Sequence, residues 1–486
     1  MNRGASLAAL AAVVLAASAH IGSPDTYYEG LAGPYRVRVI VRAPGVVPGL
    51  AQITVRLLDG RPASVVTVLP VYWDPRVAVP PPPDTARIVS GDPSLYGAAL
   101  WLMTGGSYSV QVTVTGSLGH GTAIVPVQAI ATRRLELQKP VAVGLAAFGA
   151  FLFIGALTII AAAVREAPLA PGVEPDPARV RRSRIASGVG GVLLLAGVLG
   201  GWKWWNGVDA AFTRQIYKPL ASTTAVRTDG GRPVLRFSIV DSNWIQRRVT
   251  PLIPDHGHLV HLFMVRDDLG AFAHLHPVFV DSNTFDATLP PLPAGRYRVY
   301  ADITRESGFA ETLTDTVVLA GIAGNWRPTD TDDAWWTENS KTLEDGSHMS
   351  WERGDPALIA GQDAPLRFTV RAPDGRPAAL EPYMGMAGHL LLTRDDGSVF
   401  VHLHPLGTIS WASQQTFLLR GPADTVFGTV GLRLTEMERS GQMAAESVGS
   451  TVSFPYAFPK PGHYRLWVQV KRQHRILTGV FDAEVQ

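Results

Sequence analysis

The pattern of hydrophobic and polar positions divides the chain into β-rich and helical stretches. Over residues 20–138, alternating runs such as YRVRVIVR, AQITVRLL and YSVQVTVTG are separated by Pro- and Gly-containing segments, as is typical of half-buried strands. Two long uncharged runs follow, and alternation returns from about residue 225 to the C-terminus. The pattern predicts a mainly β protein with three β-sandwich domains, two transmembrane helices and a cleaved signal peptide.

The uncharged runs predict the membrane topology. The run at 141–164 holds 24 residues, enough at about 1.5 Å per residue to cross a bilayer core. The second span is expected at 185–205, where it ends in Lys203, Trp204 and Trp205, an interfacial anchor. Five arginines between the spans, in the segment 165–184, are typical of a loop kept in the cytoplasm.

The first residues predict export. An uncharged Ala- and Leu-rich run ends in Ala17-Ser18-Ala19, so residues 1–19 are expected to be a secretory signal peptide. The signal peptide and the positive charges of the loop indicate the same topology, in which the regions flanking the two spans are exported. We expect a protein of a bacterial-type inner (cytoplasmic) membrane, with its N- and C-terminal domains on the periplasmic or extracellular side.

The region after the second span is an internal duplication. HLFMVRDDLGAFAHLHP (261–277) aligns without gaps with HLLLTRDDGSVFVHLHP (389–405) at an offset of 128 residues. Downstream, PAGRYRVYADI matches KPGHYRLWVQV. The duplication predicts two related sandwiches, repeat 1 at 225–320 and repeat 2 at 355–486. The acidic, Trp-containing segment 321–354 is expected to be a packed linker without a chemical role.

Each repeat places three histidines on one face of a predicted hairpin. In repeat 2 a type I′ turn at Asp396-Gly397 would set Leu391 opposite His402. The other face is purely apolar, so the imidazoles should point away from the sandwich interior. Two imidazoles at i and i+2, with a third across the hairpin, can converge on one metal ion. The candidate ligands are His261, His274, His276, His389, His402 and His404.

A short motif upstream of each hairpin adds second-tier ligands. Repeat 1 has Asp255-His256-Gly257-His258, whereas repeat 2 has Tyr383-Met384-Gly385-Met386 at the aligned positions. Thioether together with imidazole favours copper, because soft ligands select Cu(I), and zinc is the second choice. Strict alternation places His258 and Met386 on the face opposite the triads unless a Gly-containing bend intervenes. The second-tier residues here are His256, His258, Met384 and Met386.

Two further second-tier ligands lie in the N-terminal domain. Signal cleavage would make His20 the first residue, and its α-amine and imidazole could bind one ion together with His120 in a copper histidine brace. The alternative is an exposed first residue and a turn histidine between two glycines.

Composition narrows the chemistry further. The chain has no cysteine, which removes disulfides, thiolate catalysis and cysteine metal sites. Lys plus Arg number 43 and Asp plus Glu 41, without a basic block, so nucleic acid is not an expected partner. The sequence contains no phosphate-binding loop, H-E-x-x-H or G-x-S-x-G motif. We therefore expect no enzyme, with an oxidase of the histidine-brace type as the alternative.

Two stretches resemble known families. GGSYSVQVTVTGSLGHGTAIVPV, taken with His20, resembles the CopC-type periplasmic copper-binding β-sandwich, although Leu118 stands where that family usually has an Asp. The C-terminal repeats, with AHLHP and VHLHP, resemble YtkA-like immunoglobulin-like secreted domains of bacterial membrane proteins. The first resemblance implies copper binding, and the second implies the fold and export.

The sequence thus favours a membrane-anchored periplasmic metal-handling protein that binds copper through His/Met clusters on duplicated hairpins. Its expected partners are the metal ion and, through two spans, the lipid bilayer. The alternative is an interaction module for an envelope protein or a glycan, in which the histidines only pack, for instance between the repeats.

Overall fold

The computed structural model describes residues 20–21, 25–60, 63–166, 169–170, 172–324, 330–340, 343–354, 356–421, 424, 426–440 and 448–486. The predicted signal peptide at 1–19 lies outside these residues. The chain forms two compact units, one of residues 131–217 and the other of the remaining residues.

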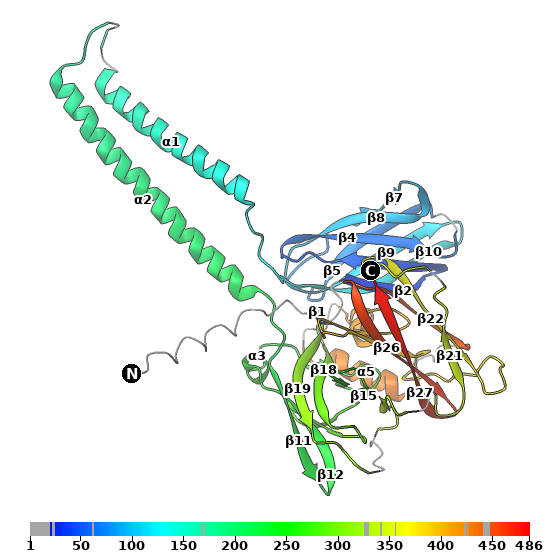
Figure 1. Cartoon of the computed structure of the whole chain (residues 1–486). Helices are drawn as coiled ribbons and strands as arrows, with labels where there is room; N and C mark the ends of the chain where they lie inside the picture. Colours follow the sequence, from blue (N-terminus) through cyan, green and yellow to red (C-terminus); the bar gives the residue numbers. More distant parts are fainter. Residues whose placement is uncertain are drawn as a thin grey trace, which may run out of the picture. The chain divides into compact units, whose positions relative to one another are not determined.

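The smaller unit is a helical hairpin (Figure 1). Helix α1 spans Lys139–Glu166 and α2 spans Pro177–Gln215, and both are long and apolar enough to cross a membrane. Helix α2 begins well before the expected span at 185–205, because Asp176 caps its N-terminus by accepting the Arg179 amide and Pro177 occupies its first turn. Arginines expected in a loop therefore lie within a helix.

The N-terminal domain is a sandwich of two antiparallel sheets, with strand orders β2-β3-β4-β8-β7 and β10-β9-β5-β6. Inward-facing residues of both sheets, mostly Val, Leu, Tyr and Ala, form its core. The strands are β2 Asp25–Ala32, β3 Tyr35–Arg42, β4 Gly49–Leu57, β5 Val65–Tyr72, β6 Asp84–Thr85, β7 Arg87–Val89, β8 Asp92–Leu102, β9 Gly106–Gly116 and β10 Gly119–Ala129.

Repeat 1 is a second sandwich. One sheet has the order β11-β12-β17-β16, and the other has the order β13-β18-β14-β15-β20 with β19 paired to β18. Its elements are β11 Ser222–Asp229, β12 Arg232–Ile239, α3 Ser242–Ile245, β13 Leu252–Ile253, β14 His261–Arg266, β15 Ala271–Leu275, β16 Val278–Asp281, β17 Thr284–Thr288, β18 Gly295–Arg305, β19 Ala310–Leu319 and β20 Ala334–Thr337.

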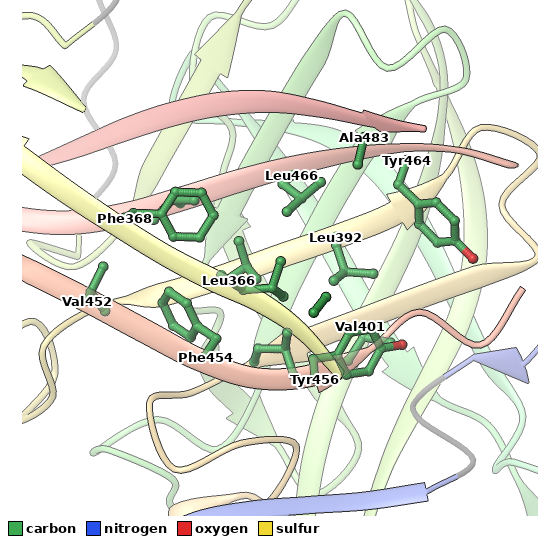
Figure 2. Packing of buried hydrophobic residues seen from close by; sticks show 14 of the residues in the cluster. Leu366, Phe368, Leu392, Val401, Val452, Phe454, Tyr456, Tyr464, Leu466 and Ala483 are labelled. Carbon is green, nitrogen blue, oxygen red and sulfur yellow. The ribbon is translucent and has the colours of Figure 1, made fainter. Parts of the chain in front are cut away.

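Repeat 2 has a similar plan, with sheets β21-β22-β25 and β1-β24-β23-β26-β27 around a core of Leu, Val and Ala side chains with several Phe and Tyr rings (Figure 2). Two helices between β24 and β25, which the sequence pattern did not predict, have no counterpart among the described residues of repeat 1. The elements are β1 His20–Ile21, β21 His348–Trp351, β22 Asp363–Arg371, β23 His389–Arg394, β24 Val399–Leu403, α4 Trp411–Leu419, α5 Thr429–Arg439, β25 Thr451–Ala457, β26 Gly462–Arg472 and β27 Arg475–Val485.

The β23–β24 hairpin has the predicted register but a different turn. Leu391 lies opposite His402. Of the two turn residues, only Gly397 has a positive φ, 71°, and its amide donates to the Arg394 carbonyl over 2.8 Å. This is a type I turn followed by a left-handed glycine, so the predicted type I′ turn is wrong. The register is nevertheless the predicted one, because the predicted turn and the observed turn both place Thr393 opposite Phe400.

The expected linker is divided between the two repeats. Strand β20 adds to the repeat 1 sheet beside β15, and β21 adds to the smaller sheet of repeat 2. Their backbone groups complete the edges of existing sheets, so this segment is part of both sandwiches.

The two larger sheets of the repeats pack against each other through an apolar patch. The ring of Phe400 stacks on Tyr300 with centroids 3.7 Å apart, and Phe272 stacks on Trp467 at 5.1 Å. Phe272 and Phe400 are equivalent positions of the duplication, as are Tyr300 and Trp467. The interface therefore has approximate twofold symmetry between the repeats.

We predict that Phe400→Ala in the full-length protein lowers the free energy of unfolding by about 3–5 kcal/mol, because a fully buried ring leaves a cavity between the repeats. Denaturant titration in detergent, followed by tryptophan fluorescence, measures the loss. The matched control is Phe279→Ala, which removes a ring that is 55% exposed and should cost much less. Equal losses in the two variants would contradict this account of the interface.

Candidate metal centre between the two repeats

Eight histidines meet where the two hairpins face each other. Ring distances repeat across the duplication: His261–His276 and His389–His404 are 5.0 and 5.1 Å apart, and the two hairpins meet at His274–His402, 5.7 Å apart. The imidazoles point away from each sandwich core, as predicted. The cluster consists of His256, His258, His261, His274, His276, His389, His402 and His404.

The second-tier histidines reach the cluster through a tight turn. Asp255 and His258 exchange two backbone hydrogen bonds, and His256 and Gly257 both have positive φ, 52° and 87°. These are the features of a type I′ turn, which supplies the bend that strict alternation lacked. As a result the ring of His258 lies 4.0 Å from that of His276, on the same side as the triad.

The aligned turn of repeat 2 has the same form. Tyr383 and Met386 exchange the corresponding backbone bonds, and Met384 and Gly385 have φ of 49° and 79°. Both methionines are buried, with 8% and 6% exposure. Soft side chains therefore replace imidazoles at two equivalent, enclosed positions.

With the Gln469 amide oriented as in this structure, the hydrogen-bond partners assign the protons of His261 and His274 as follows. His261 Nε2 donates to the Asp255 carbonyl at 3.0 Å, and His274 Nδ1 donates to Gln469 Oε1 at 2.9 Å. The remaining nitrogens, His261 Nδ1 and His274 Nε2, are then both lone-pair donors, and they face each other at 3.4 Å. Two lone pairs in this arrangement repel each other unless a cation lies between them.

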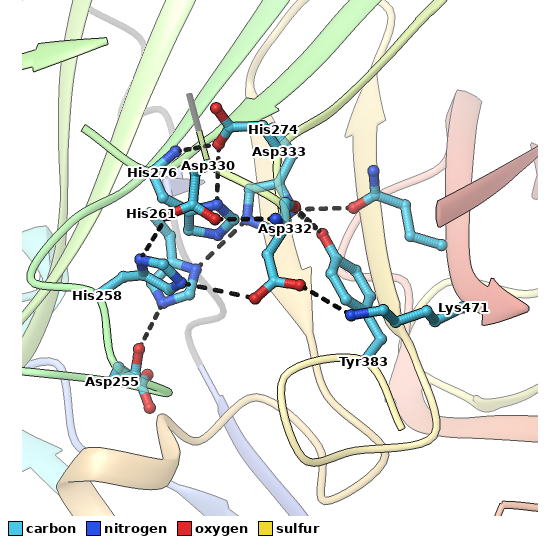
Figure 3. Close-up of polar contacts among 11 residues, drawn as sticks. Asp255, His258, His261, His274, His276, Asp330, Asp332, Asp333, Tyr383 and Lys471 are labelled. Atoms are coloured by element: carbon cyan, nitrogen blue, oxygen red, sulfur yellow. Dashed lines mark hydrogen bonds and ion pairs between the residues drawn. The ribbon is translucent and has the colours of Figure 1, made fainter. Parts of the chain in front are cut away.

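His276 completes an inner triad with these two residues (Figure 3). One ring nitrogen from each of His261, His274 and His276 lies within 4.8 Å of the others, and all three side chains are buried. His276 Nδ1 donates to Asp333 Oδ1 at 3.0 Å, while its Nε2 has no partner among the described protein atoms. Metal–nitrogen bonds of 2.0–2.1 Å require ligand separations of about 3.3 Å, so the 3.4 Å pair is already at the distance a shared ion needs.

A second triad combines the turn of repeat 1 with the hairpin of repeat 2. Ligand atoms of His256, His389 and His404 lie within 4.8 Å of one another, again all buried. Neither nitrogen of His256 or His389 has a hydrogen-bonding partner within the described chain, nor does His404 Nε2. His404 Nδ1 donates to the Ile409 carbonyl at 2.9 Å, which leaves Nε2 as a lone pair.

Outer contacts orient the imidazoles as they do in known metal sites. His402 Nδ1 donates to Asp302 at 3.2 Å, and the aligned pair is His274 with Gln469. Ligating histidines usually donate their second nitrogen to a carboxylate or a carbonyl, which fixes the ring and strengthens the lone pair. Burial raises the pKa of Asp302 to about 6, so most of this carboxylate is ionised at pH 7 and can accept.

Burial also keeps the imidazoles neutral. Desolvation lowers the pKa of His256 to about 3 and lowers the pKa values of the other affected rings, which are His261, His274, His276, His389 and His402. Neutral imidazole is the form that binds metal ions, so at pH 7 these rings need not lose a proton first.

The sequence interpretation missed the acidic segment, residues 330–333. Its carboxylates lie beside His258 and His276, with His258 Nδ1 3.6 Å from Asp330 Oδ2 (Figure 3). The sequence interpretation gave this part of the linker no chemical role, whereas the structure places its carboxylates beside two of the candidate ligands. The sequence shows that this segment is rich in acidic residues. It does not show that the segment lies beside the histidines, because that position depends on the pairing of β20 with β15.

The backbones of His20 and His120 belong to different sheets. The backbone of His20 pairs with Val399 in the large sheet of repeat 2, whereas His120 lies in β10 of the N-terminal domain, next to Gly33. Gly33 follows the far end of β2, an eight-residue strand about 25 Å long. The predicted brace therefore has its two histidines in different sheets.

We predict that the metal-free protein loses stability as the pH falls below 6.5. The folded state holds six imidazoles neutral, whereas the unfolded chain protonates them near their ordinary pKa of 6.5. The unfolded state then binds more protons, and each such ring costs about 1.4 kcal/mol per pH unit until its folded pKa is reached. Burial raises the pKa values of Asp302 and Asp333, so these two groups bind more protons in the folded state and stabilise it as the pH falls. Their effect is opposite to that of the six imidazoles, which outnumber them.

The measurement is the thermal midpoint of chelator-treated full-length protein in detergent between pH 8 and pH 5. His402→Gln removes one of these rings and should reduce the slope, whereas His463→Gln, at an exposed position, should not. A midpoint independent of pH would show that the rings are accessible to protons in the folded state.

Comparisons with known proteins bear on the family but not on the site. A comparison with curated proteins gave no match. Similar solved structures include a tetra-tandem repeat in the extending region of a large adhesion protein (10% identity, 90% of this chain and 71% of that chain, TM-score 0.15). A second is Salmonella alpha-2-macroglobulin reacted with methylamine (10% identity, 95% of this chain and 23% of that chain, TM-score 0.20). A third is the chicken CNTN1 FN1–FN3 domains (8% identity, 92% of this chain and 97% of that chain, TM-score 0.14). TM-scores this low carry no argument.

The family match is more informative. A family model described as a domain of unknown function, DUF8832, matches residues 223–320 and 341–486, about half of the chain. One model thus covers both repeats together and omits most of the segment between them. The chain belongs to the DUF8832 family.

Proposed function

We propose that this protein is a membrane-anchored metal-handling protein that holds a late first-row transition-metal ion, copper in the first place, between its two C-terminal repeats. It binds or passes on the ion without catalysing a reaction. The periplasmic or outer face of a bacterial-type inner membrane is the proposed location.

The observation that carries the proposal is the pair of facing lone pairs on His261 and His274, with the free Nε2 of His276 beside them. A buried lone pair without a partner costs about 1–3 kcal/mol, and a shared metal ion would satisfy all three. Orienting hydrogen bonds from the opposite nitrogens, to Asp255, Gln469 and Asp333, are already made.

Packing alone explains the cluster less well. The histidines do fill the interface between the repeats, as the alternative interpretation expected. Aromatic or aliphatic residues would fill it without leaving seven imidazole nitrogens that have no hydrogen-bond partner among the described residues. The neighbouring apolar patch, where Phe400 and Trp467 lie, shows that this interface accommodates such residues.

The donor set favours copper over zinc. Imidazole binds both ions, and affinity at nitrogen sites is highest for Cu(II) among the divalent ions of the series. Buried Met384 and Met386 stand at the positions of His256 and His258, and thioethers select Cu(I). Oxygen-preferring ions such as magnesium are poorly matched to a cluster of eight imidazoles.

Membrane attachment and export belong to the same proposal. It is supported by two helices of mean hydropathy 2.4 and 1.8 in their most apolar windows, with no protein burial there, and by the arginines between their apolar parts. The resemblances of the repeats to YtkA-like domains and of the N-terminal domain to CopC-type sandwiches are consistent with an exported copper protein. The resemblance to CopC-type sandwiches has less support, since His20 and His120 lie in different sheets.

We predict that the purified full-length protein binds Cu(I) in stoichiometric amount and that His276→Gln weakens binding more than about a hundredfold. Loss of an orienting residue typically costs 10- to 100-fold, and loss of a ligand should cost at least as much. Anaerobic titration of the detergent-solubilised protein against a competing Cu(I) chelator gives the affinity, and the same titration with Zn(II) ranks the ions.

His463→Gln provides the matched control, because this ring is largely exposed and lies outside the cluster. Thermal midpoints of both variants establish that they fold. Wild-type protein that binds neither copper nor zinc, or equal affinity in the two folded variants, would refute metal handling at this cluster and favour the interaction-module alternative.

A further inference from the structure

The histidine cluster has one end near solvent and one closed end. At the first end the side chains of His258, Asp330 and Asp332 keep 18%, 24% and 22% exposure. At the other end His256 and His404 are buried, and the ring of Trp411, in α4, lies 5.3 Å from that of His256. The Asp255 carboxylate holds this helix in place by accepting the Ala412 amide at 3.0 Å.

A third group of potential ligands lies at the open end. Ligand atoms of His258, His276 and Asp330 lie within 4.8 Å of one another, and we call this group the outer site. His276 is 3% exposed, and its Nε2 is without a partner in the described structure. An unpartnered, buried imidazole nitrogen beside a carboxylate indicates a ligand site rather than a solvated acidic surface.

The remaining acidic residues support this group rather than join it. Asp332 pairs with Lys471 at 3.3 Å and lies 3.9 Å from His258 Nε2, while Asp333 holds His276 through both its backbone amide and Nδ1 (Figure 3). Asp330 accepts the Asp332 amide with one oxygen, which leaves the other directed toward His258.

His276 belongs to both the outer site and the inner triad. An ion at the outer site can therefore reach His261 and His274 by exchanging ligands around one shared imidazole. Ring contacts continue beyond the triad from His274 to His402 at 5.7 Å and from His402 to His404 at 4.5 Å. From His276 through His274 and His402 to His404, neighbouring ring centroids thus lie 4.5–5.7 Å apart.

Resting on the function proposed above, we propose that the outer site is the receiving site for the metal ion and that His276 passes the ion to the buried triads. Its mixed carboxylate and imidazole donors bind a soft ion less strongly than imidazole alone, which favours onward transfer. Direction follows from the departures from symmetry: repeat 2 has Met386 in place of His258, and α4 covers the opposite end.

The test is the rate of loading. Full-length protein in detergent is mixed rapidly with cuprous ion supplied as its acetonitrile complex, and the rate and final stoichiometry are measured for wild type, Asp330→Asn and His258→Ala. Clefts lined by opposite charge raise association rates at least about tenfold, so Asp330→Asn should load about tenfold more slowly. His258→Ala removes a ligand of the outer site and should also load more slowly. In both variants the copper held by the two buried triads should still be bound at equilibrium. Glu338→Gln removes a carboxylate from the same linker, paired with Arg266 outside the cluster, and should load at the wild-type rate.

The outcomes separate this inference from the function on which it rests. Wild-type protein that binds no copper refutes both. Normal wild-type binding with unchanged loading rates in folded Asp330→Asn and His258→Ala overturns only the receiving role of the outer site. Loss of bound copper at equilibrium, without slower loading of the remainder, also overturns it, because the outer site would then be a storage site.

Discussion

Burial of imidazoles between two sheets is the constraint on which the rest of this structure depends. Side chains that can hydrogen-bond through both nitrogens are taken out of water, and desolvation costs free energy wherever a nitrogen has no partner. The adjoining stacked pairs, Tyr300 with Phe400 and Phe272 with Trp467, bury the apolar surface that holds the sheets together. The interface is thus divided into an apolar part that provides stability and an imidazole part available for chemistry.

The duplication gives the interface its approximate symmetry, and the differences between the repeats give the two ends of the histidine cluster different surroundings. Ring distances within the two hairpins agree to about 0.1 Å at the aligned pairs His261–His276 and His389–His404. The surroundings do not agree, since an acidic segment lies beside His276, whereas helix α4 lies beside His256 at the opposite end of the cluster. In the transfer route proposed above, this difference between an open and a closed end gives the ion its direction.

Much of the fold follows from local sequence pattern, and the failures have identifiable causes. The register of β23 and β24 was predictable because period-2 alternation allows only one buried face, and a one-residue slip would reverse it. The type of the turn could not be predicted from the sequence, since Asp396 can adopt either sign of φ and the neighbouring Asp395 allows a type I turn. The length of α2 was missed because hydropathy marks the apolar part of a helix, not the caps at its ends.

For the candidate centre, the sequence by itself determined which residues share a face within each hairpin and that they point away from the core, because alternation is a local property of a strand. Only the tertiary structure decided that the two faces meet, that His256 joins His389 and His404, and that Asp330 and Asp333 lie beside His276. These contacts join residues more than 50 positions apart, and they depend on how sheets pack and on where an edge strand such as β20 pairs. Neither is encoded in the periodicity of any single segment.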